Sequence, residues 1–285
     1  QIGPKAECSK IVYSDASRTG YGGYVVSIAN SNTESHGMWD QIDSNKSSAW
    51  RELKAVDLIM KSISHELSNS RVKWFTDNQS VAIIAVKGSM KPDLQNIVLS
   101  MCRTCMHRNI QLEMEWVPRT DNQRADMLSK IIDNDDWQVS DECFHFFENL
   151  WGPHSVDRFA SYYNNKVMRF NSRFWNPGCE DVDSFTVDWG TDNNWVVPPI
   201  SIVSRVILFM KQRRSRGTLV CPKWFSAPYW PLLFPNGVNP IRAVKDMYEI
   251  PCSHGVLIPG RGNNDGFILN MRRSTILAIR IDFSY

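Results

Sequence analysis

The chain has 285 residues, enough for two domains of ordinary size, and 42% of them are apolar, which suffices for packed cores and argues against disorder. Its formal net charge is only +2, so any surface for nucleic acid has to be a local patch. The seven cysteines have no regular spacing, which indicates a reducing compartment and argues against a disulfide framework.

The sequence carries no signal for a membrane. No apolar run approaches the roughly 20 residues that cross a bilayer, and no segment resembles a signal peptide. The first residue is Gln1 instead of Met, so we expect the chain to be a piece of a longer polypeptide. We expect an intracellular protein, in the cytoplasm or the nucleus, without membrane contact.

The first half predicts a mixed sheet with helices on its faces. We expect strands at 11–15, 21–29, 35–42, 71–77 and 110–116, with a polar hairpin turn at 30–33. We expect helices from Ser47 or Ser48 to about residue 63, over 80–87, over 92–107, and from Asn122 onward. Gly22 and Gly23 indicate a bulge or a close backbone approach in the second strand.

Four carboxylates fall at the ends of these predicted elements. Asp15 ends the first strand and Asp77 ends the fourth. Glu52 lies in an early turn of the first long helix, where on its own it would simply favour the helix dipole, and Asp126 lies in the first turn of the last helix. If the fourth strand joins the sheet beside the first, all four carboxylates converge at one edge.

Carboxylates brought together repel one another unless cations hold them. Mg²⁺ prefers hard oxygen ligands and keeps several of its waters. Two such ions can activate an attacking water and stabilise a leaving oxygen in phosphodiester cleavage. This chemistry requires no Cys or His, and the segments around the four acids contain none.

Four segments of the first half resemble the RNase H domain of retroelement reverse transcriptases, over about residues 9–132. They are 13–17 (YSDAS), 50–53 (WREL), 75–78 (FTDN) and 122–129 (NQRADMLS). The phrase EWVPR at 115–119 is similar to the branch found in DIRS-type retrotransposons. The resemblance implies cleavage of the RNA strand of an RNA–DNA hybrid with two Mg²⁺ or Mn²⁺ ions, and a polymerase domain upstream in the same polypeptide.

The resemblance also implies roles for individual residues. The catalytic residues and metal ligands are the four acids, Asp15, Glu52, Asp77 and Asp126. The residues assigned to substrate binding are Asn78, Ser17, Arg119 and Asn122. Many relatives carry a His in the loop before the last acid, but the loop at 117–121 has none, and Arg119 is the candidate to compensate.

The second half predicts a separate α/β domain over 156–285, after a linker or bridging element at 133–155. A strand, a Pro-Pro loop, a helix and a strand follow one another over 194–222, which suggests a unit of doubly wound type. The segments 157–160 (DRFA), 188–189 (DW) and 197–200 (VPPI) resemble phage-like DNA adenine methyltransferases. We therefore expect a Rossmann-like, methyltransferase-like second domain.

The chain differs from active methyltransferases of this family at the residues that carry the chemistry. Active members have Asn or Asp before the two prolines, to accept from the target amino group, and an aromatic residue after them, to stack on the flipped base. Val197 cannot accept and Ile200 stacks poorly. No Gly-rich cofactor loop follows a strand, so we do not expect S-adenosylmethionine to bind. We expect a degenerate domain that packs or binds nucleic acid.

The sequence thus predicts an α/β protein with an RNase H-like mixed five-stranded sheet and a second α/β domain. Its predicted activity is that of an RNase H-type endonuclease, a hydrolase that acts on RNA–DNA hybrids by two-metal-ion catalysis within a retroelement polyprotein. Two alternatives stay open. One is a non-catalytic domain that binds nucleic acid or a polymerase, and the other is a DNA adenine methyltransferase acting through the C-terminal domain.

Overall fold

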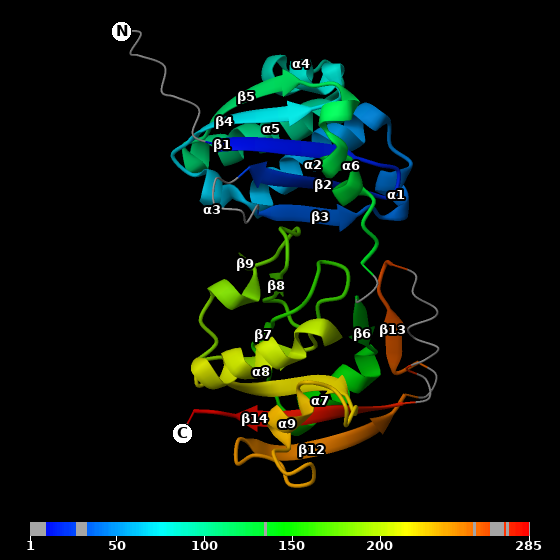
Figure 1. The fold of residues 1–285 in the computed structure, drawn as a ribbon, viewed down its shortest axis with the longest axis vertical. Helices are drawn as coiled ribbons and strands as arrows, with labels where there is room; N and C mark the ends of the chain where they lie inside the picture. Colours follow the sequence, from blue (N-terminus) through cyan, green and yellow to red (C-terminus); the bar gives the residue numbers. More distant parts are fainter. Residues whose placement is uncertain are drawn as a thin grey trace. The chain divides into compact units, whose positions relative to one another are not determined.

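The computed structural model describes residues 10–26, 33–133, 136–252, 255–262, 271 and 274–284, and the chain divides into two compact units, Gln1–Ile132 and Asp133–Tyr285 (Figure 1). In the described part of the chain, every helix is too short or too polar to cross a membrane.

The first unit contains a five-stranded sheet in the order β3-β2-β1-β4-β5 (Figure 1). Its strands are β1 (Lys10–Ala16), β2 (Gly20–Val26), β3 (Glu34–Met38), β4 (Arg71–Thr76) and β5 (Gln111–Trp116). The first three pair antiparallel, whereas β4 pairs in parallel with β1 and β5 in parallel with β4. The predicted mixed sheet is confirmed, including the fourth strand beside the first.

Helices flank this sheet, as predicted. They are α1 (Gln41–Ser44), α2 (Ser48–Ser62), α3 (Ser64–Leu67), α4 (Gln79–Lys87), α5 (Pro92–Arg108) and α6 (Gln123–Ser129), with a 3₁₀ turn η1 (Arg119–Asp121) before α6. The α2 helix begins where predicted because the Ser47 hydroxyl accepts from the N–H of Trp50. Gly88, at a φ of 81°, ends α4.

Two neighbouring glycines let helices approach both faces of β2. A Cβ atom at Gly22 would lie 2.4 Å from the Cβ of Leu128 in α6, and one at Gly23 would lie 2.8 Å from the Cδ1 of Ile59 in α2. Successive residues of a strand point to opposite faces, so α6 and α2 cover opposite faces of the sheet. The predicted close approach at both glycines is confirmed.

The third strand is shorter than predicted. It ends at Met38, and Ile42, the last residue of the predicted strand, lies in α1. The reason is local, because the Asp40 carboxylate accepts from the N–H of Asp43 at 2.7 Å and so starts a helix. Residues 27–29, and the predicted turn at 30–33 apart from Thr33, lie outside the described residues.

The second unit contains another five-stranded sheet, in the order β12-β14-β11-β10-β7. Its strands are β7 (Val156–Asp157), β10 (Asn193–Val196), β11 (Arg216–Pro222), β12 (Val244–Pro251) and β14 (Thr275–Asp282). β7, β10 and β11 run parallel, whereas β14 and β12 join antiparallel. The 3₁₀ turn η3 (Ile200–Ile202) and helix α8 (Val203–Gln212) connect β10 to β11, which gives the predicted strand, helix and strand.

Apolar side chains of alternating strand positions build a core on each face of this second sheet. Val196 and Leu219 face α8 and the short helix α9 (Trp230–Leu233). Trp195 and Val220 face α7 (Asp141–Trp151) and the paired strands β6 (Trp137–Val139) and β13 (Leu257–Pro259). The remaining described elements are β8 (Asn171–Ser172), β9 (Asp181–Val182) and the 3₁₀ turn η2 (Ser184–Thr186).

The segment 133–155 differs from its predicted role as a linker or bridging element. It forms β6 and α7, which belong to the second unit. Its apolar side chains enter a core of that unit, and they are Trp137, Val139, Phe144, Phe147 and Trp151. The spacing of the last three puts them on one face of α7, so burial fixes the segment to the second sheet.

Candidate metal centre

Three of the four predicted carboxylates converge at one edge of the first sheet. Oxygen atoms of Asp15, Glu52 and Asp77 all lie within 4.8 Å of one another. The sheet explains the meeting, because β1 and β4 are parallel neighbours and Asp15 and Asp77 lie at their carboxyl ends. The α2 helix contacts β1 and carries Glu52 to the same place.

Glu52 is deeply buried, at 5% exposure, and Asp15 is buried to a similar degree, at 4%. Its carboxylate accepts from the backbone N–H of Ala16, but its Oε2 atom is buried and has no hydrogen-bond partner among the described residues. Burial raises the pKa of Glu52 from 4.5 to about 9, and repulsion from Asp15 and Asp77 adds to the shift. A buried acceptor without a donor is costly, and a cation at this point would relieve the cost.

Asp15 and Asp77 are in a similar electrostatic environment. Burial raises the pKa of Asp15, and the hydroxyl of Ser129, which donates to Asp15 Oδ2 at 2.7 Å, partly reverses the shift. Burial also raises the pKa of Asp77, against the attraction of the Arg119 guanidinium. The three acids form an oxygen-only donor set without nitrogen or sulfur, which fits a hard divalent cation such as Mg²⁺ or Mn²⁺.

Asp126 lies outside this group of three, although it interacts electrostatically with Asp15 and Asp77. Its Oδ1 atom lies 3.0 Å from Arg119 Nη2, and its Oδ2 atom lies 2.6 Å from Lys130 Nζ. Partial burial would raise the pKa of Asp126, but the hydrogen bonds from Lys130 and Arg119 hold it below its usual range. The sequence predicted four converging acids, and the structure brings three together and pairs the fourth with two cations.

Two of the predicted substrate-binding residues bind the protein itself. The Ser17 hydroxyl donates to the backbone carbonyl of Ser129 at 2.7 Å. Asn122 is 1% exposed, and its amide donates to the carbonyl of Ser14 at 2.9 Å. Both contacts fasten α6 to β1, so these side chains position the acids and offer little surface to a substrate.

The other two predicted substrate-binding residues lie nearer the surface. Asn78 is half-buried, and its side-chain oxygen accepts from the N–H of Val81 and so begins α4. The Arg119 side chain is 73% exposed and pairs with Asp126.

Three further residues contact the acids and were missed in the sequence. Ser129 and Lys130 follow Asp126 by three and four positions, a spacing that places them on the same helix face and would have identified them. The third is Trp116, whose indole N–H donates to the backbone carbonyl of Asp77 at 3.0 Å. No local pattern connects Trp116 to Asp77, because their contact depends on the pairing of β4 with β5.

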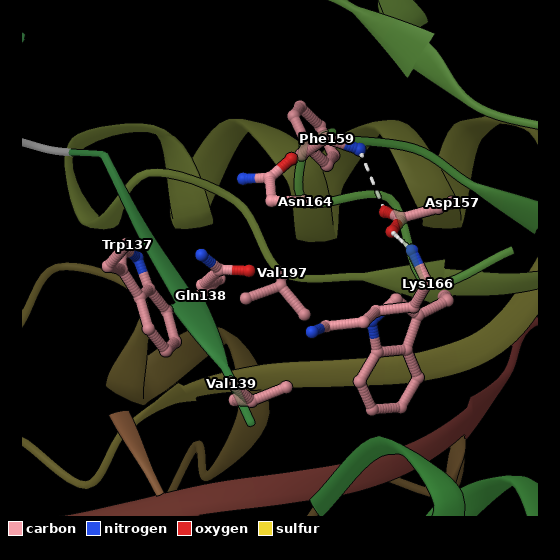
Figure 2. Close-up of a pocket in the computed structure, with 9 residues that line it drawn as sticks. Trp137, Gln138, Val139, Asp157, Phe159, Asn164, Lys166 and Val197 are labelled. Atoms are coloured by element: carbon pink, nitrogen blue, oxygen red, sulfur yellow. Dashed lines mark hydrogen bonds between the residues drawn. The ribbon is translucent and has the colours of Figure 1, made fainter. Parts of the chain in front are cut away.

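Figure 2 shows the corresponding strand ends of the second sheet, beside Asp157. A cavity of about 10 Å³ lies beside Asp157, at the carboxyl ends of β7 and β10, and a space this small holds about one water. The Asp157 carboxylate accepts from the backbone N–H groups of Phe159 and Lys166, and burial raises its pKa to about 6. The Trp137 indole N–H donates to the carbonyl of Pro198 at 3.1 Å.

Comparisons with known proteins give matches among solved structures. No family model matches the chain, and no curated protein matches it. The RNase H1 of the halophilic archaeon Halobacterium salinarum NRC-1 is 20% identical over 42% of this chain and 92% of that chain, with a TM-score of 0.36. LC11-RNase H1 in complex with an RNA/DNA hybrid is 18% identical over 42% of this chain and 93% of that chain, with a TM-score of 0.37.

A foamy viral protease-reverse transcriptase in complex with an RNA/DNA hybrid also matches. It is 14% identical over 45% of this chain and 20% of its own chain, with a TM-score of 0.32. With identities and TM-scores this low, the strand order and the carboxylates of the chain itself have to support a functional proposal.

Proposed function

We propose that the first unit is an RNase H-type endoribonuclease that hydrolyses the RNA strand of RNA–DNA hybrids with two Mg²⁺ or Mn²⁺ ions. One observation carries the proposal. Three carboxylates, on β1, on α2 and directly after β4, meet at the carboxyl ends of the two strands, and buried Glu52 keeps an oxygen without a hydrogen-bond partner among the described residues. A fold that needed only stability would not retain three mutually repelling acids there.

In this proposal the four acids hold the ions, and they are Asp15, Glu52, Asp77 and Asp126. When bound, the ions supply an activated water and stabilise the charge that develops on the scissile phosphate. The chain's own contribution is orientation. The Ala16 N–H and the Ser129 hydroxyl each bind one carboxylate and fix which oxygens face inward. The indole of Trp116 holds the backbone at Asp77.

The wider context follows from the sequence resemblance. We propose that the chain is part of a DIRS-type retroelement polyprotein, with a reverse transcriptase polymerase domain upstream, and that it acts in the cytoplasm or nucleus. The second unit would be a degenerate methyltransferase-like domain. The parallel β7, β10 and β11 with α8 between the last two support such a domain, and Val197 before the two prolines opposes methyl transfer.

Cleavage of a labelled RNA–DNA hybrid in Mg²⁺ or Mn²⁺ tests the proposal. Asp77→Asn keeps the shape of the side chain and removes its charge, so we expect RNA-strand cleavage to fall at least ~100-fold, as when one electrostatic stabiliser is lost. The matched control is Asp93→Asn, which removes an exposed acid from the first turn of α5 and should cut like the wild type.

Two outcomes would contradict the proposal. If neither the wild type nor Asp93→Asn cuts the hybrid with either ion, the first unit is not this nuclease, and binding of the uncut hybrid would favour the non-catalytic alternative. If Asp77→Asn cuts as fast as the wild type, the activity does not belong to the carboxylate site.

A further inference from the structure

A positively charged side chain lies among the acids of the candidate metal centre. Arg119 comes from the 3₁₀ turn η1 between β5 and α6, and its Nη2 atom lies 3.0 Å from Asp126 Oδ1. The pKa of Arg119 is raised by the hydrogen bond and charge of Asp126, and also by the charges of Asp77 and Asp15. One guanidinium therefore lies in the field of three carboxylates from three different elements.

The acids on the two sides of this guanidinium are neutralised very differently. Asp126 has a cation at each oxygen, Arg119 at one and Lys130 at the other. Glu52, by contrast, has an oxygen with no hydrogen-bond partner among the described residues, and Asp15 accepts from the neutral hydroxyl of Ser129. In the described part of the chain no ion pair reaches the group of three acids, whereas Asp126 already has two.

We propose that Arg119 is an internal counter-ion that takes the place of the second metal ion and has to leave Asp126 when that ion binds. The inference rests on the proposed function, in that it treats the four acids as a site for two divalent cations. A guanidinium and a divalent ion repel each other and compete for the same carboxylate oxygen. The two ions therefore bind in order, the first at Asp15, Glu52 and Asp77, and the second by exchange with Arg119.

The position of Arg119 suits such an exchange. Its side chain is 73% exposed, so it can swing into solvent without breaking a packed core. Lys130, four residues after Asp126 on the same helix, keeps the other oxygen of Asp126 oriented during the exchange. An ordinary surface ion pair of this kind contributes little to stability, so its loss should leave the fold intact.

Calorimetric titration with Mn²⁺, in the absence of nucleic acid and at low ionic strength, tests the inference. In Arg119→Gln the second Mn²⁺ should bind about 5- to 10-fold more tightly than in the wild type, because no cation has to be displaced. The affinity for the first Mn²⁺ should change by a smaller factor. Arg119→Lys keeps the charge and should retain the weak second site. High salt should reduce the difference, since it screens exposed charges.

The matched control is Arg124→Gln. Arg124 lies in α6 beside Asp126, but its guanidinium pairs with Glu34 and lies over the ring of Tyr24. Its loss removes one positive charge from the helix that carries Asp126 and should leave the affinity for both ions within about 2-fold of the wild type, as expected when an exposed charge does not face the site.

The inference is overturned if the wild type and Arg119→Gln bind the second Mn²⁺ with equal affinity. It is also overturned if Arg124→Gln raises the affinity for the second Mn²⁺ as much as Arg119→Gln does, or if the wild type binds no Mn²⁺. Hybrid cleavage tests the proposed function separately. If the wild type cuts the hybrid, but Arg119→Gln and the wild type bind Mn²⁺ with the same affinities, only the inference fails. If the second Mn²⁺ binds more tightly to Arg119→Gln and no hybrid is cut, the inference stands and the nuclease proposal fails.

Discussion

At the scale of single residues, burying the Glu52 carboxylate costs the folded state free energy. Glu52 is 5% exposed, it faces two other acids, and one of its oxygens has no hydrogen-bond partner among the described residues. Such an arrangement opposes folding whenever the carboxylate is ionised and no cation is present. Cost of this kind is typical of functional sites, where strain serves binding or catalysis.

The pH dependence of stability measures this cost. The folded-state pKa of Glu52 is raised from 4.5 to about 9, so its contribution to stability is fully present below pH 4.5 and is lost as the pH rises through about 9. In the presence of a chelator, the free energy of unfolding of the wild type should therefore fall relative to that of Glu52→Gln across this range. Urea unfolding at a series of pH values provides the comparison.

Saturating Mg²⁺ should flatten the pH dependence of the wild type, because the ion binds the ionised carboxylate. Glu66→Gln is the control, since it removes a partly exposed glutamate of α3 and should run parallel to the wild type. Parallel curves for the wild type and Glu52→Gln in chelator would show that Glu52 ionises as freely in the folded state as in the unfolded chain.

At the scale of elements, the docking of α6 on β1 decides where two of the acids lie. Three side-chain hydrogen bonds hold α6 against the end of β1. The Ser17 hydroxyl donates to the Ser129 carbonyl, the Asn122 amide donates to the Ser14 carbonyl, and the Ser129 hydroxyl donates to Asp15. Gly22 of the neighbouring strand β2 lets α6 lie directly on the sheet. The helix therefore acts as a clamp that fixes the carboxyl end of β1.

Ser129→Ala tests this clamp. The variant loses the hydroxyl that donates to Asp15, so the pKa of Asp15 should rise further and the first Mn²⁺ should bind more weakly at neutral pH, because more protons have to leave. We expect a loss of ~1 kcal/mol in unfolding free energy as well, the usual value for one buried hydrogen bond. Urea unfolding and Mn²⁺ titration measure the two effects.

Ser62→Ala is the control that separates the loss of the hydrogen bond from Ser129 to Asp15 from a general loss of stability. Ser62 is also a buried serine near a helix end, but its hydroxyl donates to the carbonyl of Leu58 within α2. It should lose a similar amount of stability and bind Mn²⁺ like the wild type. If both variants weaken Mn²⁺ binding equally, the Ser129 hydroxyl has no special part in orienting Asp15.

Much of the first unit could be predicted because its signals are local. Apolar periodicity located β1, β4, β5 and α2, and the Ser47 cap and Gly88 marked helix ends. The end of β3 was missed because the helix cap at Asp40, which stops the strand, was not recognised. The ion pair between Arg119 and Asp126 and the contact between Trp116 and Asp77 were missed because they depend on loop and strand geometry that no short pattern encodes. The pair of Asp126 with Lys130, four residues later, was available from the spacing alone.

At the scale of the whole molecule, the two units treat their strand ends in opposite ways. The first brings three acids together at the carboxyl ends of β1 and β4, and Glu52 there keeps an oxygen without a hydrogen-bond partner among the described residues. The second satisfies its charged groups internally, since buried Arg158 donates to Asn194, Asn171 and Asp192. Cation binding is therefore expected at the strand ends of the first unit, whereas at those of the second the buried charge of Arg158 is already neutralised by Asp192.

The same contrast predicts how the full chain responds to S-adenosylmethionine. The cavity beside Asp157 measures about 10 Å³, far too little for a nucleoside, and the indole of Trp137 already binds the carbonyl of Pro198 in the Pro-Pro loop. Saturating S-adenosylmethionine should therefore leave every unfolding transition in a thermal-shift assay within about 1 °C of its original midpoint, because a ligand that does not bind adds no stability.

Mn²⁺ serves as the positive control in the same assay and should raise the unfolding midpoint of the first unit, since it binds the folded site. A ligand present at 100 times its dissociation constant adds about 2.7 kcal/mol, which shifts the midpoint of a domain of 100 to 150 residues by several degrees. A rise of that size with S-adenosylmethionine would mean that β6 and the Pro-Pro loop separate to admit the cofactor. The second unit would then have to be regarded as a candidate methyltransferase in spite of Val197.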